Sequence, residues 1–135
     1  MILLDSSVLI ELYRKKKKEK TFFYRLAESE TEFSISSVTH YEFGIGDRSF
    51  EDDYGSDLYK NLVVLPFNKS CSQTAIGIYL ALKKQNKLID LADLLIGATA
   101  LTYDYQLATL NRKHFERIPG IQLVSNQTID NRGKV

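Results

Sequence analysis

The first twelve residues read MILLDSSVLIEL (Met1–Leu12) and predict a buried strand that runs directly into a helix. Residues 2–4 are an unbroken apolar run, and apolar residues resume at helical spacing from Val8. A strand that is apolar on both faces is typical of a parallel sheet covered by helices. Such open α/β sheets bind ligands at the carboxyl ends of their strands. Asp5 follows the strand at that end.

On this stretch alone Asp5 has two interpretations. Aspartate is a preferred N-cap residue because its carboxylate accepts hydrogen bonds from the free N–H groups of the first helical turn. A plain cap of the following helix is therefore the favoured interpretation here. The alternative is a functional carboxylate at the edge of the sheet. Residues elsewhere in the chain have to decide between the two.

Length and composition fit one domain. The chain has 135 residues, of which 44% are hydrophobic, enough for one substantial core. We expect the domain to span residues 1–125 and the polar residues 126–135 to form a frayed tail. Neither a long apolar run nor a secretory leader is present, which predicts a cytoplasmic protein without a membrane span. The single cysteine, Cys71, excludes an intramolecular disulfide and a cysteine-based zinc site.

The net charge of +1 means that any nucleic-acid binding must be local. Lys15–Lys18 and Lys20 form a basic cluster, but such a run is more typical of a solvated loop than of a binding surface. The acidic, weakly patterned segment at 47–57 is predicted to be a mobile loop.

Strands alternate with helices along the chain. Further strands are predicted at 33–36, 63–65, 106–110 and 121–123, and the main later helices around Glu42, at 70–85 and at 88–101. This alternation predicts an α/β fold with a mostly parallel sheet and helices on both faces. Ser36 or Ser37 is expected to cap the helix that carries Glu42, and Ser70 or Ser72 the helix after the third strand. Tyr41 and Ile45, four residues apart, are expected to face the core.

The stretch LIDLADLLIGATAL (Leu88–Leu101) is apolar nearly all round except for two acids at its amino end. Asp90 as N-cap with Asp93 three residues later is similar to a capping box, so Asp90 is interpreted mainly as a helix cap. Gly97 lies one turn after Asp93. Glycine inside a helix costs about 1 kcal/mol relative to alanine, which indicates close approach of a backbone or a ligand there.

Four of these residues are expected to meet in one cleft. Asp5 and Asn111 follow strand ends, Glu42 lies in the helix after the second strand, and Asp93 opens a helix facing the same edge. Two carboxylates about 5 Å apart repel by roughly 3 kcal/mol at an effective dielectric of 20, so three of them need a cation or a raised pKa. Magnesium suits such oxygen ligands and supports phosphodiester hydrolysis.

The two histidines do not predict a competing zinc site. His40 and Glu42 are two residues apart and point to different helix faces, and His114 has no partner at ligand spacing. A phosphoacceptor receiver or an aspartyl-phosphate phosphatase would need a further acid beside Asp5, where this chain has Ser6 and Ser7.

Four segments together resemble the PIN-domain ribonucleases of the VapC toxin type. They are MILLDSSVLIEL, SSVTHYEFGIG, DLLIGATAL and ATLNRKHFERIPGIQL, in that order and over almost the whole chain. The resemblance implies a PIN-like three-layer α/β/α sandwich with its sheet in the order 3-2-1-4-5. It implies a metal-dependent endoribonuclease whose Asp5, Glu42 and Asp93 hold Mg²⁺ or Mn²⁺.

The same resemblance implies an RNA substrate, a VapB-like antitoxin partner and, together with the apolar first helices, a homodimer. Asn111 stands at the fourth site position, where a fully acidic pattern has a further acid, which leaves open whether one or two ions bind. Ser6 and Thr109 are expected to hydrogen-bond the carboxylates around the ion, with Asp90 nearby. The alternatives are a non-toxin PIN nuclease of RNA processing and a catalytically inactive PIN binding module.

Overall fold

A computed structural model describes residues 1–46, 58 and 60–125. The loop predicted at 47–57 and the tail predicted at 126–135 lie outside these residues. The apolar start of the chain forms β1 (Ile2–Leu4), and three further strands follow: β2 (Phe33–Ser36), β3 (Val63–Leu65) and β4 (Gln106–Ala108). They build one parallel sheet in the order β3-β2-β1-β4, with β1 in its interior as its apolar composition predicts.

The predicted order 3-2-1-4 is therefore confirmed for four strands, but the fifth strand is not formed. The segment predicted at 121–123 lies beside β4 and meets it at a single parallel bridge, from Leu123 to Leu107. Backbone hydrogen bonds flank that bridge on both sides, from Leu107 N to Gln122 O (2.8 Å) and from Val124 N to Leu107 O (2.9 Å). Because β4 has only three residues, its outer edge offers too few backbone groups for a longer pairing.

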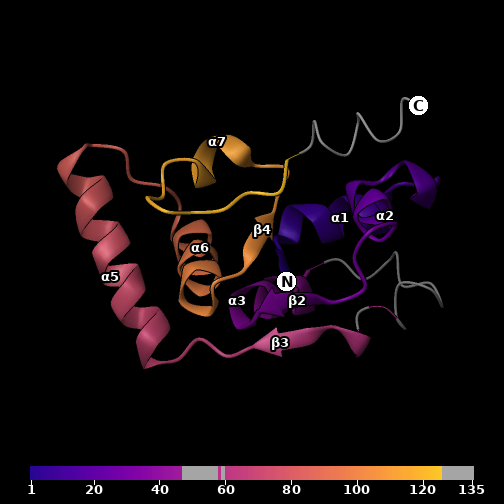
Figure 1. The fold of residues 1–135 in the computed structure, drawn as a ribbon, viewed down its shortest axis with the longest axis horizontal. Coiled ribbons are helices and arrows are strands. Elements are labelled where there is room, and N and C mark those ends of the chain that lie inside the picture. Colours follow the sequence, from indigo (N-terminus) through magenta and orange to yellow (C-terminus); the bar gives the residue numbers. More distant parts are fainter. Residues whose placement is uncertain (47–57, 59, 126–135) are drawn as a thin grey trace.

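Seven helical segments surround this sheet in the described residues. They are α1 (Ser6–Arg14), the 3₁₀ turn η1 (Lys18–Lys20), α2 (Phe22–Leu26), α3 (Ser37–Gly44), α5 (Lys69–Lys84), α6 (Leu91–Tyr103) and α7 (Arg112–Phe115). Helices α1 and α2 lie on one side of the sheet, and α5, α6 and α7 lie on the other (Figure 1). None of the helices in the described residues combines the length and the apolar character needed to cross a membrane.

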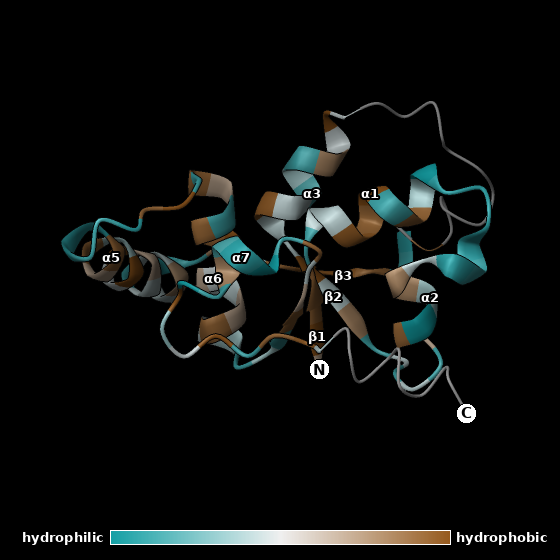
Figure 2. Ribbon diagram, turned by 90° about the horizontal axis from the view of Figure 1, so that it is seen from above, coloured by the Kyte–Doolittle hydropathy of each residue, from teal (hydrophilic) through white to brown (hydrophobic). Residues whose placement is uncertain are grey.

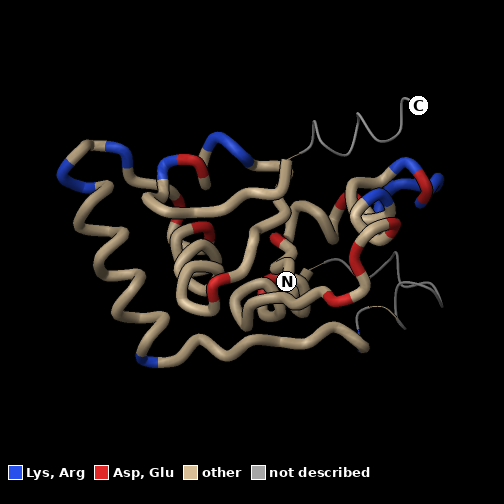
Figure 3. Tube along the Cα trace, in the orientation of Figure 1, with Lys and Arg blue, Asp and Glu red and all other residues tan. Residues whose placement is uncertain are grey.

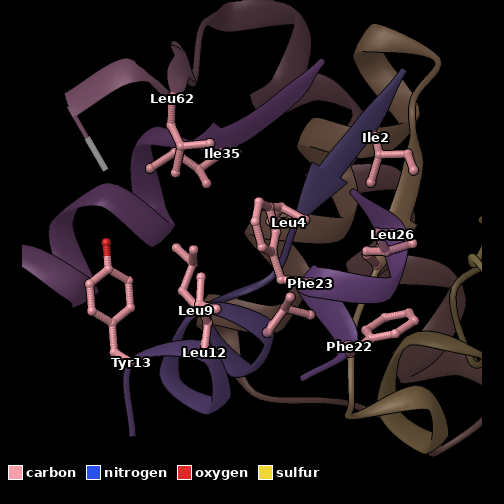
Figure 4. Close-up of a cluster of buried hydrophobic side chains, with 12 residues drawn as sticks. Ile2, Leu4, Leu9, Leu12, Tyr13, Phe22, Phe23, Leu26, Ile35 and Leu62 are labelled. Atoms are coloured by element: carbon pink, nitrogen blue, oxygen red, sulfur yellow. The ribbon is translucent and has the colours of Figure 1, made fainter. Parts of the chain in front are cut away.

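The alternation of side chains along β1 explains these two helical layers. Ile2 and Leu4 point into a core shared with α1 and α2, where Leu9 and Phe23 are fully buried neighbours (Figure 4). Leu3 points the opposite way, into a second core shared with α5, α6 and α7. One apolar strand thus anchors both layers, and the three-layer α/β/α arrangement follows from it.

Helix α3 packs differently from its prediction. Ser36 caps it as expected, because its hydroxyl accepts a hydrogen bond from Thr39 N (3.0 Å). Tyr41 and Ile45, however, are 65% and 69% exposed, so the prediction that they face the core is wrong. The inward stripe of α3 instead carries Thr39 and Phe43, the latter packed against the first core. This rotation of the helix is what turns Glu42 toward the carboxyl edge of the sheet.

Two other local predictions are corrected. The cap of α5 is Asn68 rather than Ser70 or Ser72, since its side-chain oxygen accepts from Cys71 N (3.1 Å). The close approach expected at Gly97 is made by a core side chain. A Cβ added at Gly97 would lie 2.3 Å from Cδ1 of Ile118, so the glycine makes room for the segment that follows α7.

Candidate active site

Asp5 lies at the carboxyl end of β1 and is almost completely buried, with 1% exposure. It occupies the N-cap position of α1, but its side chain makes no capping hydrogen bond, so the favoured interpretation as a plain cap is wrong. Its Oδ2 accepts hydrogen bonds from Ser7 Oγ (2.7 Å) and Thr109 Oγ1 (2.8 Å). Oδ1 has only a long contact with Ser6 Oγ, at 3.5 Å. The second oxygen of Asp5 is thus left available for a ligand.

The hydroxyl groups around Asp5 also fix the neighbouring turn. Ser7 Oγ accepts a hydrogen bond from Leu110 N (3.0 Å), and Thr109 Oγ1 accepts one from Asn111 N (2.9 Å). They tie the start of α1 to the turn between β4 and α7. Thr109 is a residue that the sequence places beside the carboxylates, whereas Ser7 was missed. Its position two residues after Asp5, in the first turn of a helix, is the signal that could have indicated it.

Glu42 reaches the same edge from α3. Its Oε1 is buried and has no hydrogen-bond partner in the described part of the chain. Burial raises the pKa of Glu42 most, and the charges of Asp5 and Asp93 raise it further. The three carboxylates predicted to converge therefore share one electrostatic environment. Burying a carboxylate oxygen without a hydrogen-bond partner lowers the stability of the fold. This arrangement indicates a binding site for a positively charged ligand.

Asp93 lies in the first turn of α6 and is partly buried. Burial raises its pKa most, and the charges of Asp5 and Asp90 add to this, against a lowering by the hydrogen bond and the charge of His114. Asp90 is the N-cap residue of α6, but its side chain makes no capping hydrogen bond. The interpretation of Asp90 mainly as a helix cap is thus wrong, since the exposed carboxylate points to the site instead.

His114, which sequence spacing excluded as a metal ligand, lies at the site. Its Nδ1 lies 3.2 Å from Asp93 Oδ2, and His114, Asp93 and Asp90 each offer a ligand atom within 4.8 Å of the others. The statement that His114 has no partner at ligand spacing is therefore wrong. Spacing within one helix cannot reveal this contact, because the fold brings α7 against the start of α6. The signal available in the sequence was the position of His114, three residues after Asn111 at a strand end.

Asn111 is placed at the rim of the site. It is exposed, it is the N-cap residue of α7, and its side chain makes no capping hydrogen bond. The structure thus brings Asp5, Glu42 and Asp93 into electrostatic contact. Asn111 joins their hydrogen-bond network through its backbone N–H, which donates to Thr109 Oγ1.

These residues fit a divalent cation. Glu42 Oε1 is an orphaned buried oxygen, Asp5 has one lightly engaged oxygen, and burial raises the pKa of both Glu42 and Asp93. Hard ions such as Mg²⁺ and Mn²⁺ prefer carboxylate oxygens. Imidazole nitrogen is tolerated by Mn²⁺ more readily than by Mg²⁺, so His114 widens the set of metals that this edge could take.

Comparison with known proteins identifies the family. Residues 2–121 match the PIN domain, which covers most of the chain. The chain belongs to the PIN domain family. It is 36% identical over 126 residues to Ribonuclease VapC1 of Methanocaldococcus jannaschii, covering 87% of this chain and 80% of that protein. Ribonuclease VapC of Rickettsia bellii is 29% identical over 135 residues, with 92% and 95% of the two chains covered.

Solved PIN structures share the fold. A chain of VapBC-1 from nontypeable Haemophilus influenzae superimposes with a TM-score of 0.74 at 26% identity, covering 93% of this chain and 98% of that one. The PIN match begins at β1 and ends just after α7, so it includes every candidate site residue described above. The carboxylates at the sheet edge therefore lie within the part of the chain that is common to the family.

Proposed function

We propose that this protein is a metal-dependent endoribonuclease that hydrolyses RNA phosphodiester bonds as the toxin of a VapBC-like toxin–antitoxin module. The observation that carries the proposal is the buried Glu42 Oε1, which has no protein partner in the described residues and lies in the field of Asp5 and Asp93. A bound cation would offset the cost of burying this unpaired oxygen. The likeness to proteins named Ribonuclease VapC supports RNA as the substrate class.

In this proposal Asp5, Glu42 and Asp93 hold the ion. A bound Mg²⁺ or Mn²⁺ would supply Lewis-acid activation of the phosphodiester bond. Ser7 and Thr109 orient Asp5 by binding its Oδ2, while Oδ1 has a 3.5 Å contact with Ser6 Oγ and would be available to the ion. Glu42 brings a buried oxygen that has no protein partner in the described residues, and this oxygen would bind the ion. His114 orients Asp93 through the 3.2 Å contact, and Asn111 lies where it can touch substrate at the rim.

The partners follow from the same relatives. VapBC structures pair a VapC with a VapB, so we propose a VapB-like antitoxin as the inhibitor of this chain. We also propose that the protein acts in the cytoplasm as a homodimer and that residues 1–125 form its single domain. Light scattering of the purified chain without antitoxin tests the dimer, and a monomer at micromolar concentrations would contradict it.

The decisive experiment compares wild type with Asp93→Asn on total RNA, with Mg²⁺, with Mn²⁺ and with EDTA, and sequences the new RNA ends. Asp93→Asn is nearly isosteric and removes one repelling charge, so we expect a folded protein with cleavage reduced at least a hundredfold. Asp104→Asn, at an exposed residue outside the site, is the matched control and should cleave like wild type. Full activity of folded Asp93→Asn would remove Asp93 from the mechanism, and no cleavage by wild type would favour an inactive binding module.

A further inference from the structure

The fold gathers positive charge on one side of the acidic edge. Basic residues lie on α7 and at the end of α5 with the loop that follows it, as the blue segments of Figure 3 show. A hydrogen bond from Arg117 Nη1 to Leu88 O (3.2 Å) joins the two regions. We call this surface the α7 ridge, and it consists of Lys83, Lys84, Lys87, Lys113 and Arg117.

The α7 ridge borders the candidate active site directly. Residues 110–114 line an open pocket of about 360 Å³, and His114, the last of them, contacts Asp93. Lys113 is exposed and makes no ion pair in the described part of the chain, so its ammonium group is available to a ligand. Arg112 is engaged elsewhere, because its Nη1 donates to Val124 O (2.7 Å) and its Nε lies 3.7 Å from Glu116.

The second basic cluster, at Lys15–Lys18 and Lys20, is in a different situation. Lys18 Nζ donates to Leu12 O (2.7 Å) and Tyr13 O (3.1 Å), and Lys15 pairs with Glu11 at 3.4 Å. Lys18 therefore satisfies carbonyl groups of the last turn of α1, and Lys15 is neutralised by Glu11. They also lie at the far end of a nine-residue helix whose start carries the site, about 14 Å away at 1.5 Å per residue.

A single-stranded nucleic acid is the ligand that fits both the acidic edge of the sheet and the α7 ridge beside it. Its scissile phosphate needs the acidic edge with a cation, while the flanking phosphates need positive charge within one nucleotide of that edge. Only the α7 ridge offers this among the basic surfaces of the described residues. The pocket at 110–114 provides an exposed leucine and an amide beside Lys113, which suit a ribose and a base edge.

We infer that the RNA strand leaves the site across the turn between β4 and α7, with Lys113 binding the phosphate next to the cleaved bond. This inference rests on the proposed function, since it describes the path of the same substrate. It assigns the binding role to the α7 ridge and none to the lysine cluster at the end of α1.

The test measures binding of a short fluorescent single-stranded RNA by anisotropy at several salt concentrations, with Mg²⁺ and an Asp5→Asn background that prevents cleavage. Lys113→Gln removes one phosphate contact. We expect the slope of log K against log salt to become shallower by about 0.7 and the affinity at 0.1 M salt to fall about fivefold. Lys17→Gln, at an exposed lysine of the other cluster, is the matched control and should bind like the parent.

Two results would overturn the inference: unchanged binding and slope for Lys113→Gln, or equal losses for Lys113→Gln and Lys17→Gln. The second would mean that RNA responds only to overall charge. Either result leaves the proposed function standing as long as the protein with Asp5 intact cleaves RNA. Failure of the proposed function is separate, because it would appear as loss of cleavage in the otherwise unmodified protein.

Discussion

At the scale of single residues, the carboxylates of this site differ in how fully the protein hydrogen-bonds them. Asp5 is buried and its Oδ2 accepts from two hydroxyl donors, whereas Glu42 is half-buried and its buried Oε1 has no partner in the described residues. Burial raises the pKa of Glu42 and of Asp93, and their negative neighbours add to it. The hydroxyl groups therefore hold Asp5 in a fixed orientation, while a nearby cation would stabilise the ionised forms of Glu42 and Asp93.

These raised pKa values predict an unusual pH dependence of stability without metal. The native state binds protons at Glu42 and Asp93 more tightly than the unfolded chain, whose pKa values are the ordinary 4.5 and 3.8. Their contribution to the free energy of unfolding is thus greatest at low pH and is lost as the pH rises through the folded pKa values. Urea unfolding in EDTA, repeated at pH values from acidic to neutral, measures the free energy of unfolding at each pH.

The variant Asp93→Asn tests whether the carboxylates of the site, rather than other carboxyl groups of the chain, cause this pH dependence of stability. It removes one of the two titrating groups and lowers the repulsion on Glu42, so its stability should decline less steeply with rising pH. Asp104→Asn is the control: it lies outside the cluster at a left-handed position that asparagine accepts, and it should follow wild type. Identical pH profiles for wild type and Asp93→Asn would contradict the assignment.

At the scale of elements, helix α6 connects the site to the core. Its first turn carries Asp93, and one turn further the helix contacts the segment after α7 at Gly97, where the side chain of Ile118 approaches. The contact holds α7 against α6, and this packing brings His114 to Asp93. A glycine in the middle of a helix is thus explained by close packing that positions a site residue.

We predict that Gly97→Ala destabilises the protein by about 1 kcal/mol. The clash with Ile118 costs about 1–3 kcal/mol, and the gain in helix propensity returns about 1 kcal/mol. Combining it with Ile118→Val, which removes the clashing Cδ1, should cost less than the sum of the two single changes. Urea unfolding of the four proteins measures the coupling.

Gly77→Ala provides the matched control for this helix prediction. Gly77 lies in the exposed face of α5, and an added Cβ would meet nothing within 4 Å. Only the propensity gain remains there, so we expect Gly77→Ala to stabilise by up to about 1 kcal/mol. Strict additivity of Gly97→Ala and Ile118→Val would show that Ile118 is not what requires the glycine.

At the scale of the whole molecule, the carboxylates at the edge of the sheet repel one another, and a bound cation would reduce this repulsion. Figure 2 shows α1, α3 and α7 grouped at the end of the strands opposite the N-terminus. The acids of the site come from the end of β1, from α3 and from α6, so metal binding is coupled to the stability of the entire fold, because the unfolded chain has no such cluster.

A divalent ion should therefore raise the melting temperature. At a concentration one hundred times its dissociation constant the ion adds about 2.7 kcal/mol to the free energy of unfolding. Asp93→Asn should be more stable than wild type in EDTA and gain less from Mg²⁺ or Mn²⁺. Asn111→Asp should behave in the opposite way, since it adds a charge at the rim. Melting curves measure all three proteins, and equal shifts for wild type and Asp93→Asn would refute the cluster.

Much of the architecture could be predicted from residues 2–4 and their successors. An unbroken apolar strand is stable only between two helical layers, and the alternation of strands and helices then requires parallel pairing. β2 and β3 begin and end where their β-branched and apolar residues predict. Asp5, Glu42 and Asp93 could be proposed because the carboxyl ends of parallel strands lie at one edge.

What the chain alone determined, then, was the periodicity that builds strands and helices and the acids that follow them, because these depend on neighbours in sequence. The contact of His114 with Asp93 joins residues distant in sequence, and the outward rotation of Tyr41 and Ile45 depends on how a helix rolls on the sheet. Such contacts are selected by packing of the two cores, and only the tertiary structure decided them.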